Sequence, residues 1–105
     1  MLDYTTREKK FLSVKLIDGQ MVFIGVPKKQ LFSRLTHLEE NLKNTEEIEP
    51  LYDEVLQLTA EILSNNKSGT KFTAEAVDEI MDFEDMALLI REYSAYAGAI
   101  VKNPN

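Results

Sequence analysis

The stretch that decides the fold is residues 72–86, which read FTAEAVDEIMDFEDM. Thr73 is a good helix N-cap because its side-chain oxygen can accept a hydrogen bond from the first helical turn. Phe72 before the cap and Val77 at the fourth helical position form a hydrophobic staple. These signals predict a short helix that begins after Thr73 and runs to Met81.

The same stretch opens a second, longer helix. Asp82 is its N-cap, and Glu84 and Asp85 lie in its first turn, where the helix dipole favours negative charge. The apolar face of this helix is wider than burial against a single neighbour requires. That face comprises Phe83, Met86, Ala87, Ile90, Tyr93, Ser94, Ala97 and Val101, widened by Leu89, Tyr96 and Ile100. Gly98 within it indicates either fraying of the helix end or close approach of another backbone.

Two further helices are predicted on the N-terminal side of this stretch. Apolar residues at helical spacing predict one helix from Pro27 to about Lys43 and another from Glu46 or Pro50 to Ser64. Their apolar stripes are Leu31, Leu35, Leu38 and Leu42 in the first, and Leu51, Val55, Leu58 and Ile62 in the second. We expect the two helices to form an antiparallel pair.

Residues 11–26 predict a β-hairpin, because Asp18-Gly19 is a favoured two-residue turn between apolar runs. The predicted core face opposes Leu16 with Met21, Val14 with Phe23, and Leu12 with Gly25. The predicted second face opposes Lys15 with Val22, Ser13 with Ile24, and Phe11 with Val26. A lone hairpin is marginally stable, so the second face needs cover, either from helices of the same chain or from another subunit.

The 105 residues predict one α+β domain, mostly helical, in which an N-terminal β-hairpin precedes about four helices. Its expected parts are a flexible N-terminus (1–9), the hairpin (10–26), a helical region (27–102) and a tail (103–105). The chain has no cysteine and one histidine, His37, which lies off the apolar stripe and is interpreted as a surface residue. We therefore expect no metal site and no cofactor.

Charge is distributed unevenly along the chain, whose net charge is −6. Residues 1–43 hold eight basic and five acidic residues, whereas residues 44–105 hold four and thirteen. The two parts attract each other either within one fold or head to tail between copies. An acidic chain is a poor candidate for nucleic-acid binding, and no apolar run approaches the ~20 residues that a membrane helix needs. We expect a cytoplasmic protein.

One constellation points superficially to an enzyme. Glu46, Glu49, Glu75 and Asp78 match the carboxylate pattern of all-helical nucleotide pyrophosphohydrolases, in which acidic side chains hold magnesium against phosphates. Glu75 and Asp78, however, are predicted to point away from the core, and helix capping explains the acidic residues more simply. A non-catalytic protein is expected, with the pyrophosphohydrolase as an alternative that predicts magnesium-dependent release of pyrophosphate.

Several stretches carry a resemblance to a known family. Residues 56–67 (LQLTAEILSNNK), Phe72-Thr73, residues 82–94, and residues 7–11 with the hairpin resemble tail assembly chaperones of long-tailed bacteriophages and prophages of Gram-positive bacteria. The resemblance implies a chaperone that binds the tape measure protein and helps recruit tail tube subunits. It also implies a protein of the host cytoplasm that is absent from the mature virion. A longer product made by ribosomal frameshifting near Lys102-Asn103 would be typical of the family.

Apolar residues on the second hairpin face and on the last helix are the candidate partner-binding residues. They are Phe11, Val22, Ile24, Val26, Leu89, Tyr93, Tyr96 and Ile100. Both surfaces exceed what a minimal core needs, so a homo-oligomer is also possible. The alternative from another functional class is a generic cytoplasmic adaptor or antitoxin-like binding module.

Overall fold

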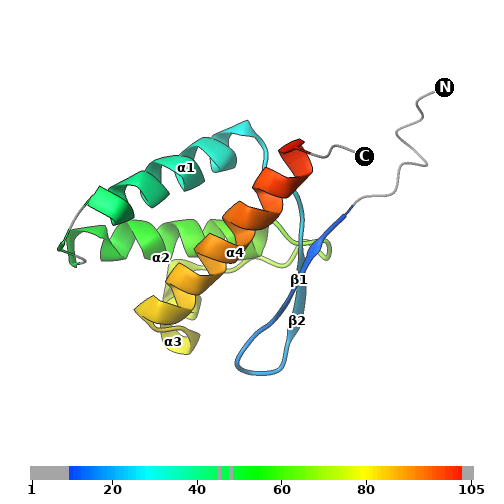
Figure 1. The fold of residues 1–105 in the computed structure, drawn as a ribbon. Coiled ribbons are helices and arrows are strands. Elements are labelled where there is room, and N and C mark those ends of the chain that lie inside the picture. The colour runs from blue at the N-terminus through cyan, green and yellow to red at the C-terminus, as the bar shows by residue number, and fades with distance from the viewer. Residues whose placement is uncertain (1–9, 45, 48, 103–105) are drawn as a thin grey trace.

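The structure, a computed structural model, describes residues 10–44, 46–47 and 49–102 (Figure 1). The predicted α+β class is confirmed: an N-terminal hairpin precedes four helices. The elements are β1 (Leu12–Lys15), β2 (Met21–Ile24), α1 (Lys29–Asn44), α2 (Glu49–Ser64), α3 (Ala74–Ile80) and α4 (Phe83–Lys102). The predicted flexible N-terminus (1–9), the tail (103–105) and Asn103 of the frameshift site lie outside the described residues.

Helix α2 is the centre of the fold. It contacts α1, α3, α4 and β2, and α4 also contacts α1. In Figure 1 the hairpin stands at one end of the helical region, while the end of α1 and the start of α2 lie at the other. Helices α1 and α2 are therefore antiparallel neighbours, as predicted.

One apolar core joins the helices to the hairpin. The predicted stripes enter it: Leu35 and Leu38 from α1, Val55, Leu58 and Ile62 from α2, and Met86, Ile90, Tyr93 and Ala97 from α4 are buried. Burial of the valine, leucine, isoleucine and methionine side chains among them stabilises the fold by roughly 1.5–3 kcal/mol each. Among the residues that the structure describes, no helix is both long and apolar enough to cross a membrane.

The predicted caps separate α3 from α4. The Thr73 side chain accepts a hydrogen bond of 3.1 Å from the amide of Ala76. Asp82 Oδ1 accepts a 2.8 Å bond from the amide of Asp85, and Asp85 Oδ2 accepts a 3.0 Å bond from the amide of Asp82. This reciprocal pair satisfies two backbone amides that would otherwise lack a partner at the start of α4. The caps at Thr73 and Asp82, both predicted from the sequence, therefore mark where α3 and α4 begin.

Helix α1 begins later than predicted. Pro27 precedes the helix, which starts at Lys29. The side-chain amide of Asn65 donates hydrogen bonds to the carbonyl oxygens of Gly25 and Val26, so the backbone before Lys28 is held in a connecting segment. The prediction that Pro27 is the first helical residue is therefore wrong.

The hairpin register differs from the predicted one by a single residue. The observed pairs are Leu12 with Ile24, Ser13 with Phe23, Val14 with Val22, and Lys15 with Met21. The loop contains three residues: the Leu16 amide donates to the Gln20 carbonyl and the Gly19 amide donates to the Leu16 carbonyl, both at 2.9 Å. Gly19 has a φ of +91°, as the last residue of such a three-residue loop requires.

This shift exchanges the two faces of β2, because successive side chains of a strand point to opposite sides. Val22 and Ile24 are buried, whereas Met21 is 49% and Phe23 is 43% exposed. The prediction that Met21 and Phe23 belong to the core face is wrong. All four residues of β2 are apolar, so their hydropathy alone does not select the buried pair. Helices of the same chain supply the cover that Val22 and Ile24 need.

Candidate protein-binding surface

The outward-pointing side chains of the hairpin form an exposed surface that includes two large apolar residues. We call this surface the hairpin outer face and define it as Phe11, Ser13, Lys15, Met21 and Phe23. Met21 and Phe23 are two positions apart on β2 and lie opposite Lys15 and Ser13 of β1. Two large apolar side chains therefore lie side by side in solvent, next to one polar and one basic residue.

A third chain segment borders this face. Asn66 forms an antiparallel bridge with Ile24, and the amide of Lys67 donates a 2.8 Å hydrogen bond to the carbonyl of Phe23. The Lys67 ammonium lies 5.5 Å from the centre of the Phe11 ring, within the range of a cation–π contact. The bordering segment thus widens the sheet beyond two strands and places a second lysine beside the apolar residues.

Phe11 extends the face beyond the end of β1. Its ring lies 3.7 Å from where a Cβ atom on Gly25 would be, so it packs over the glycine backbone. The ring is half-buried in this position. Phe11 therefore remains a candidate contact residue on the outer face, and its ring lies beside Gly25, not opposite Val26 as the predicted register would place it.

A groove of about 310 Å³ continues the apolar surface from the hairpin to α4. It follows β1 on the side that lacks a strand neighbour within the described part of the chain. Ile17 at the hairpin tip is 70% exposed, and Leu88 on the α4 wall is 48% exposed. Asp85 and Glu92 of α4 also line the groove, so its helical wall is acidic.

The structure divides the eight candidate partner-binding residues into three groups. Val22, Ile24, Leu89 and Tyr93 are buried; Phe11, Tyr96 and Ile100 are half-buried; Val26 is 42% exposed. The buried four belong to the core of this chain, so in this structure they are covered by the chain itself and not open to a partner. The broad apolar sector of α4 is used internally, because this helix packs against α1 and α2 and is hydrogen-bonded to the hairpin.

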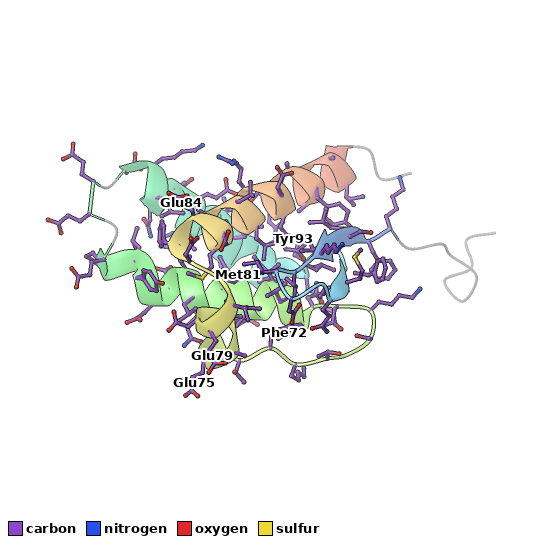
Figure 2. The ribbon with its side chains drawn as sticks, turned by 90° about the horizontal axis from the view of Figure 1, so that it is seen from below. Phe72, Glu75, Glu79, Met81, Glu84 and Tyr93 are labelled. Carbon is purple, nitrogen blue, oxygen red and sulfur yellow. The ribbon has the colours of Figure 1, made fainter. Side chains whose placement is uncertain are left out.

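Tyr93 joins α4 to the end of β2 (Figure 2). Its hydroxyl donates a 2.6 Å hydrogen bond to the carbonyl of Gly25 and accepts one of 3.2 Å from Asn65 Nδ2. Burial raises the pKa of Tyr93 to about 12, and the hydrogen bond from Asn65 opposes this shift. The phenol is therefore neutral at ordinary pH, and its role here is structural.

Tyr96 lies one turn further along α4. Its ring stacks on that of Tyr93 with centroids 6.0 Å apart, and its hydroxyl donates a 2.7 Å hydrogen bond to the carbonyl of Lys10. Burial also raises the pKa of Tyr96. The two tyrosines thus hold the open end of the hairpin, where β1 begins and β2 ends, against α4.

The four carboxylates of the pyrophosphohydrolase pattern are all exposed. Figure 2 shows Glu75, with Glu79, projecting outward from α3, and the prediction that Glu75 and Asp78 point away from the core is confirmed. Within the described ranges, no group of three or more acidic or histidine side chains could hold a metal ion.

A second, more polar cleft of about 560 Å³ lies between α1, α2 and the segment before α3. Lys28, Arg34 and Lys71 line it together with Glu61. Glu61 forms an ion pair with Arg34. The charge of Arg34 is therefore partly neutralised, and the cleft presents two lysines on an open surface.

Comparisons of this chain with protein-family models, with curated proteins and with solved structures find no match.

The residues of this surface that the sequence prediction missed are Ile17, Met21 and Phe23. Ile17-Asp18-Gly19 also fits a three-residue loop with glycine at its left-handed last position, so the loop sequence allows the observed register as well as the predicted one without choosing between them. The alternating Leu12, Val14 and Leu16 mark the inner face of β1 without ambiguity. The uniformly apolar β2 carries no equivalent signal.

Proposed function

We propose that this protein is a non-catalytic binding protein, an assembly chaperone that covers an apolar segment of its partner. The contact surface is the hairpin outer face. The observation that carries this proposal is the exposure of Met21 and Phe23 next to each other on β2, at 49% and 43%.

Apolar residues at these positions are not required by the fold. An antiparallel strand with one solvated face ordinarily carries polar side chains on that face, as Ser13 and Lys15 do on β1. Clustered apolar side chains on the surface of a charged protein are typical of interaction sites and otherwise favour aggregation. A function in partner binding explains why Met21 and Phe23 are kept in solvent.

The more specific form of the proposal follows the resemblance of residues 56–67 and 82–94 to tail assembly chaperones of long-tailed phages and prophages. In that role the protein binds the tape measure protein and helps recruit tail tube subunits in the host cytoplasm, and it is left out of the mature virion. An exposed apolar strand face suits a chaperone that must hold a helical, aggregation-prone partner until assembly.

Co-expression tests this function. The tagged chain is produced together with the long helical open reading frame expected immediately downstream of its gene, and the soluble, co-purifying partner is quantified. We expect the wild-type chain to keep the partner in solution. Met21→Thr and Phe23→Thr should each lower co-purification about tenfold, because truncation of a central apolar contact costs more than 1 kcal/mol.

Leu88→Gln is the matched control, because Leu88 is as exposed as Met21 but lies on α4. Threonine preserves strand propensity and glutamine preserves helix propensity, so circular dichroism should show all three variants folded. Equal loss of co-purification in the control, or none in the two hairpin variants, would overturn the assignment of the surface. The absence of a long helical reading frame beside the gene would overturn the tail-assembly role.

A further inference from the structure

We propose that the hairpin outer face docks an amphipathic α-helix whose apolar stripe is bordered by aspartate and glutamate residues. This inference rests on the proposed function and adds to it the chemistry of the segment that is recognised. It follows from the charge around Met21 and Phe23 and from the width of the sheet.

The charge around the face has one sign. Lys15 lies opposite Met21, and Lys67 is bonded through its amide to the carbonyl of Phe23. From residue 10 to residue 38 the sequence contains five lysines and arginines and a single acidic residue, Asp18. The carboxylate of Asp18 lies in the hairpin loop and accepts a 3.0 Å hydrogen bond from the amide of Gln20. Three of these five, Lys28, Lys29 and Arg34, follow the hairpin, so the positive charge beside the outer face comes from Lys15 and Lys67, in a chain whose net charge is −6.

This charge distribution selects among possible occupants. Acidic side chains beside an apolar stripe gain attraction from Lys15 and Lys67, whereas basic ones are repelled. A second copy docked through the same face would bring the lysines of both copies together, which disfavours a symmetric dimer there. A separate segment with acidic borders satisfies both the apolar and the charged parts of the surface.

The dimensions of the face suit a helix. Neighbouring strands lie about 4.8 Å apart, so β1, β2 and the segment at Asn66 span roughly 10 Å from first to last. An α-helix with its side chains is about 10–12 Å wide. Helices of the chain already cover the inner face of this sheet, with α2 in contact with β2. A helix on the outer face would therefore cover the side of the sheet that the helices of this chain leave in solvent.

The groove beside β1 has the opposite preference. A strand added to β1 would pass Asp85 and Glu92 on the wall formed by α4 as well as Lys15 on β1, and because the two carboxylates outnumber the lysine, this groove favours an extended segment with basic residues. The two surfaces therefore differ in the charge that they select as well as in the shape that they accept. Two peptides of opposite charge can therefore distinguish binding at the hairpin outer face from binding in the groove.

The experiment uses two synthetic helical peptides of about 18 residues, long enough to form helix in isolation. Both carry the same leucine stripe, which is bordered by glutamates in one peptide and by lysines in the other. Each is titrated into the full chain, and binding is followed by fluorescence anisotropy and by amide chemical shifts. We expect the glutamate peptide to bind about tenfold more tightly or better, with shifts at Met21, Phe23 and Lys67. Added salt should reduce this preference.

Three variants locate the effect. Lys15→Glu should reduce the preference for the glutamate peptide, Phe23→Thr should weaken binding of both peptides, and Leu88→Gln should change neither. Equal affinity for the two peptides, or preference for the lysine peptide, would overturn the proposal. Shifts confined to β1 and α4 would also overturn it, because they would place binding in the groove.

The peptide result and the co-expression result are separable. If the peptides show no charge preference while Phe23→Thr still abolishes partner co-purification, the proposed function stands and this inference fails. If the glutamate peptide binds as expected but the downstream partner does not co-purify, the inference stands and the tail-assembly function fails.

Discussion

Tyr93 in the middle of α4 donates a 2.6 Å hydrogen bond to the carbonyl of Gly25, a residue 68 positions earlier in the chain. The side-chain amide of Asn65 donates to the same carbonyl and to the Tyr93 hydroxyl, at 3.1 and 3.2 Å. The end of β2, the segment after α2 and the last helix therefore meet at one polar point inside an apolar core. This point holds the hairpin with Val22 and Ile24 inward.

Tyr93→Phe should destabilise the fold by about 1–3 kcal/mol, because it leaves the amide of Asn65 and the carbonyl of Gly25 with one partner fewer in a buried site. Urea unfolding followed by circular dichroism measures the change. Tyr96→Phe is the control: its hydroxyl also donates to a backbone carbonyl but lies nearer the surface, so the loss should be smaller. An equal loss in both variants would contradict the special role of the Tyr93 hydroxyl.

Alkaline pH should weaken the fold through the same phenol. Burial raises the pKa of Tyr93 to about 12, so an unfolded chain loses this proton first, near pH ~10. Between these values the native state binds more protons, and the free energy of unfolding falls as pH rises. The full contribution of the protonated Tyr93 to the free energy of unfolding, on the order of 2 kcal/mol, is present below pH ~10 and is lost as the pH rises toward the raised pKa. Urea unfolding across this range should show a shallower decline for Tyr93→Phe, and an unchanged decline would contradict the assignment.

Gly19→Ala should cost about 1 kcal/mol. The φ of +91° at Gly19 is strained for any residue with a side chain, although no atom lies within 4 Å of where its Cβ would be. Thermal unfolding measures the loss, and nuclear Overhauser contacts between Val14 and Val22 report the register of the wild-type hairpin. Contacts between Val14 and Phe23 as direct partners would contradict the observed register.

Thr59→Val should raise the free energy of unfolding by about 1 kcal/mol. Thr59 is fully buried in α2, and its hydroxyl has no hydrogen-bond partner within the described residues. An unpaired buried hydroxyl costs desolvation energy, which an apolar group of the same shape does not. Thr36→Val is the control, because Thr36 is exposed and bonded to the carbonyl of Phe32, and it should change stability by less than ~0.5 kcal/mol. Destabilisation by Thr59→Val would show that the hydroxyl is satisfied.

Gly98→Ala should stabilise α4 by up to about 1 kcal/mol, because glycine is a poor helix former and an added Cβ would meet no atom within 4 Å. Thermal unfolding tests this. Within the described chain, no other backbone lies close to Gly98, so close backbone approach does not explain the glycine at this position. Loss of partner co-purification in a stabilised Gly98→Ala variant would instead place a partner against this residue.

Short-range signals account for the parts of the fold that were predicted correctly. Thr73 and Asp82 mark the starts of α3 and α4 because a cap needs only neighbouring residues, and Leu35, Leu38, Leu58 and Ile62 mark buried stripes because helical periodicity repeats within two turns. Pro27 was misplaced because Asn65, distant in sequence, holds the backbone before it.

The candidate surface followed less closely from the sequence. The four consecutive apolar residues of β2 indicate that one face of the hairpin carries exposed apolar side chains. The sequence prediction assigned the exposed pair, Met21 and Phe23, to the wrong face. Tyr93 and Leu89 were candidates for partner contact because the apolar sector of α4 is broad. In the structure, the broad apolar sector of α4 packs against α1 and α2, and Tyr93 bonds to the residue that follows β2.

By itself, the sequence determined the order of the elements, the caps of α3 and α4, the inner face of β1 and the excess of basic residues in the N-terminal part of the chain. Only the tertiary structure decided which half of β2 is buried, because Met21, Val22, Phe23 and Ile24 are all apolar and a one-residue change of register exchanges their faces. The three-residue loop at Gly19 sets that register. The contact between Tyr93 and Gly25 then holds the inner face on the helices and leaves Met21 and Phe23 in solvent.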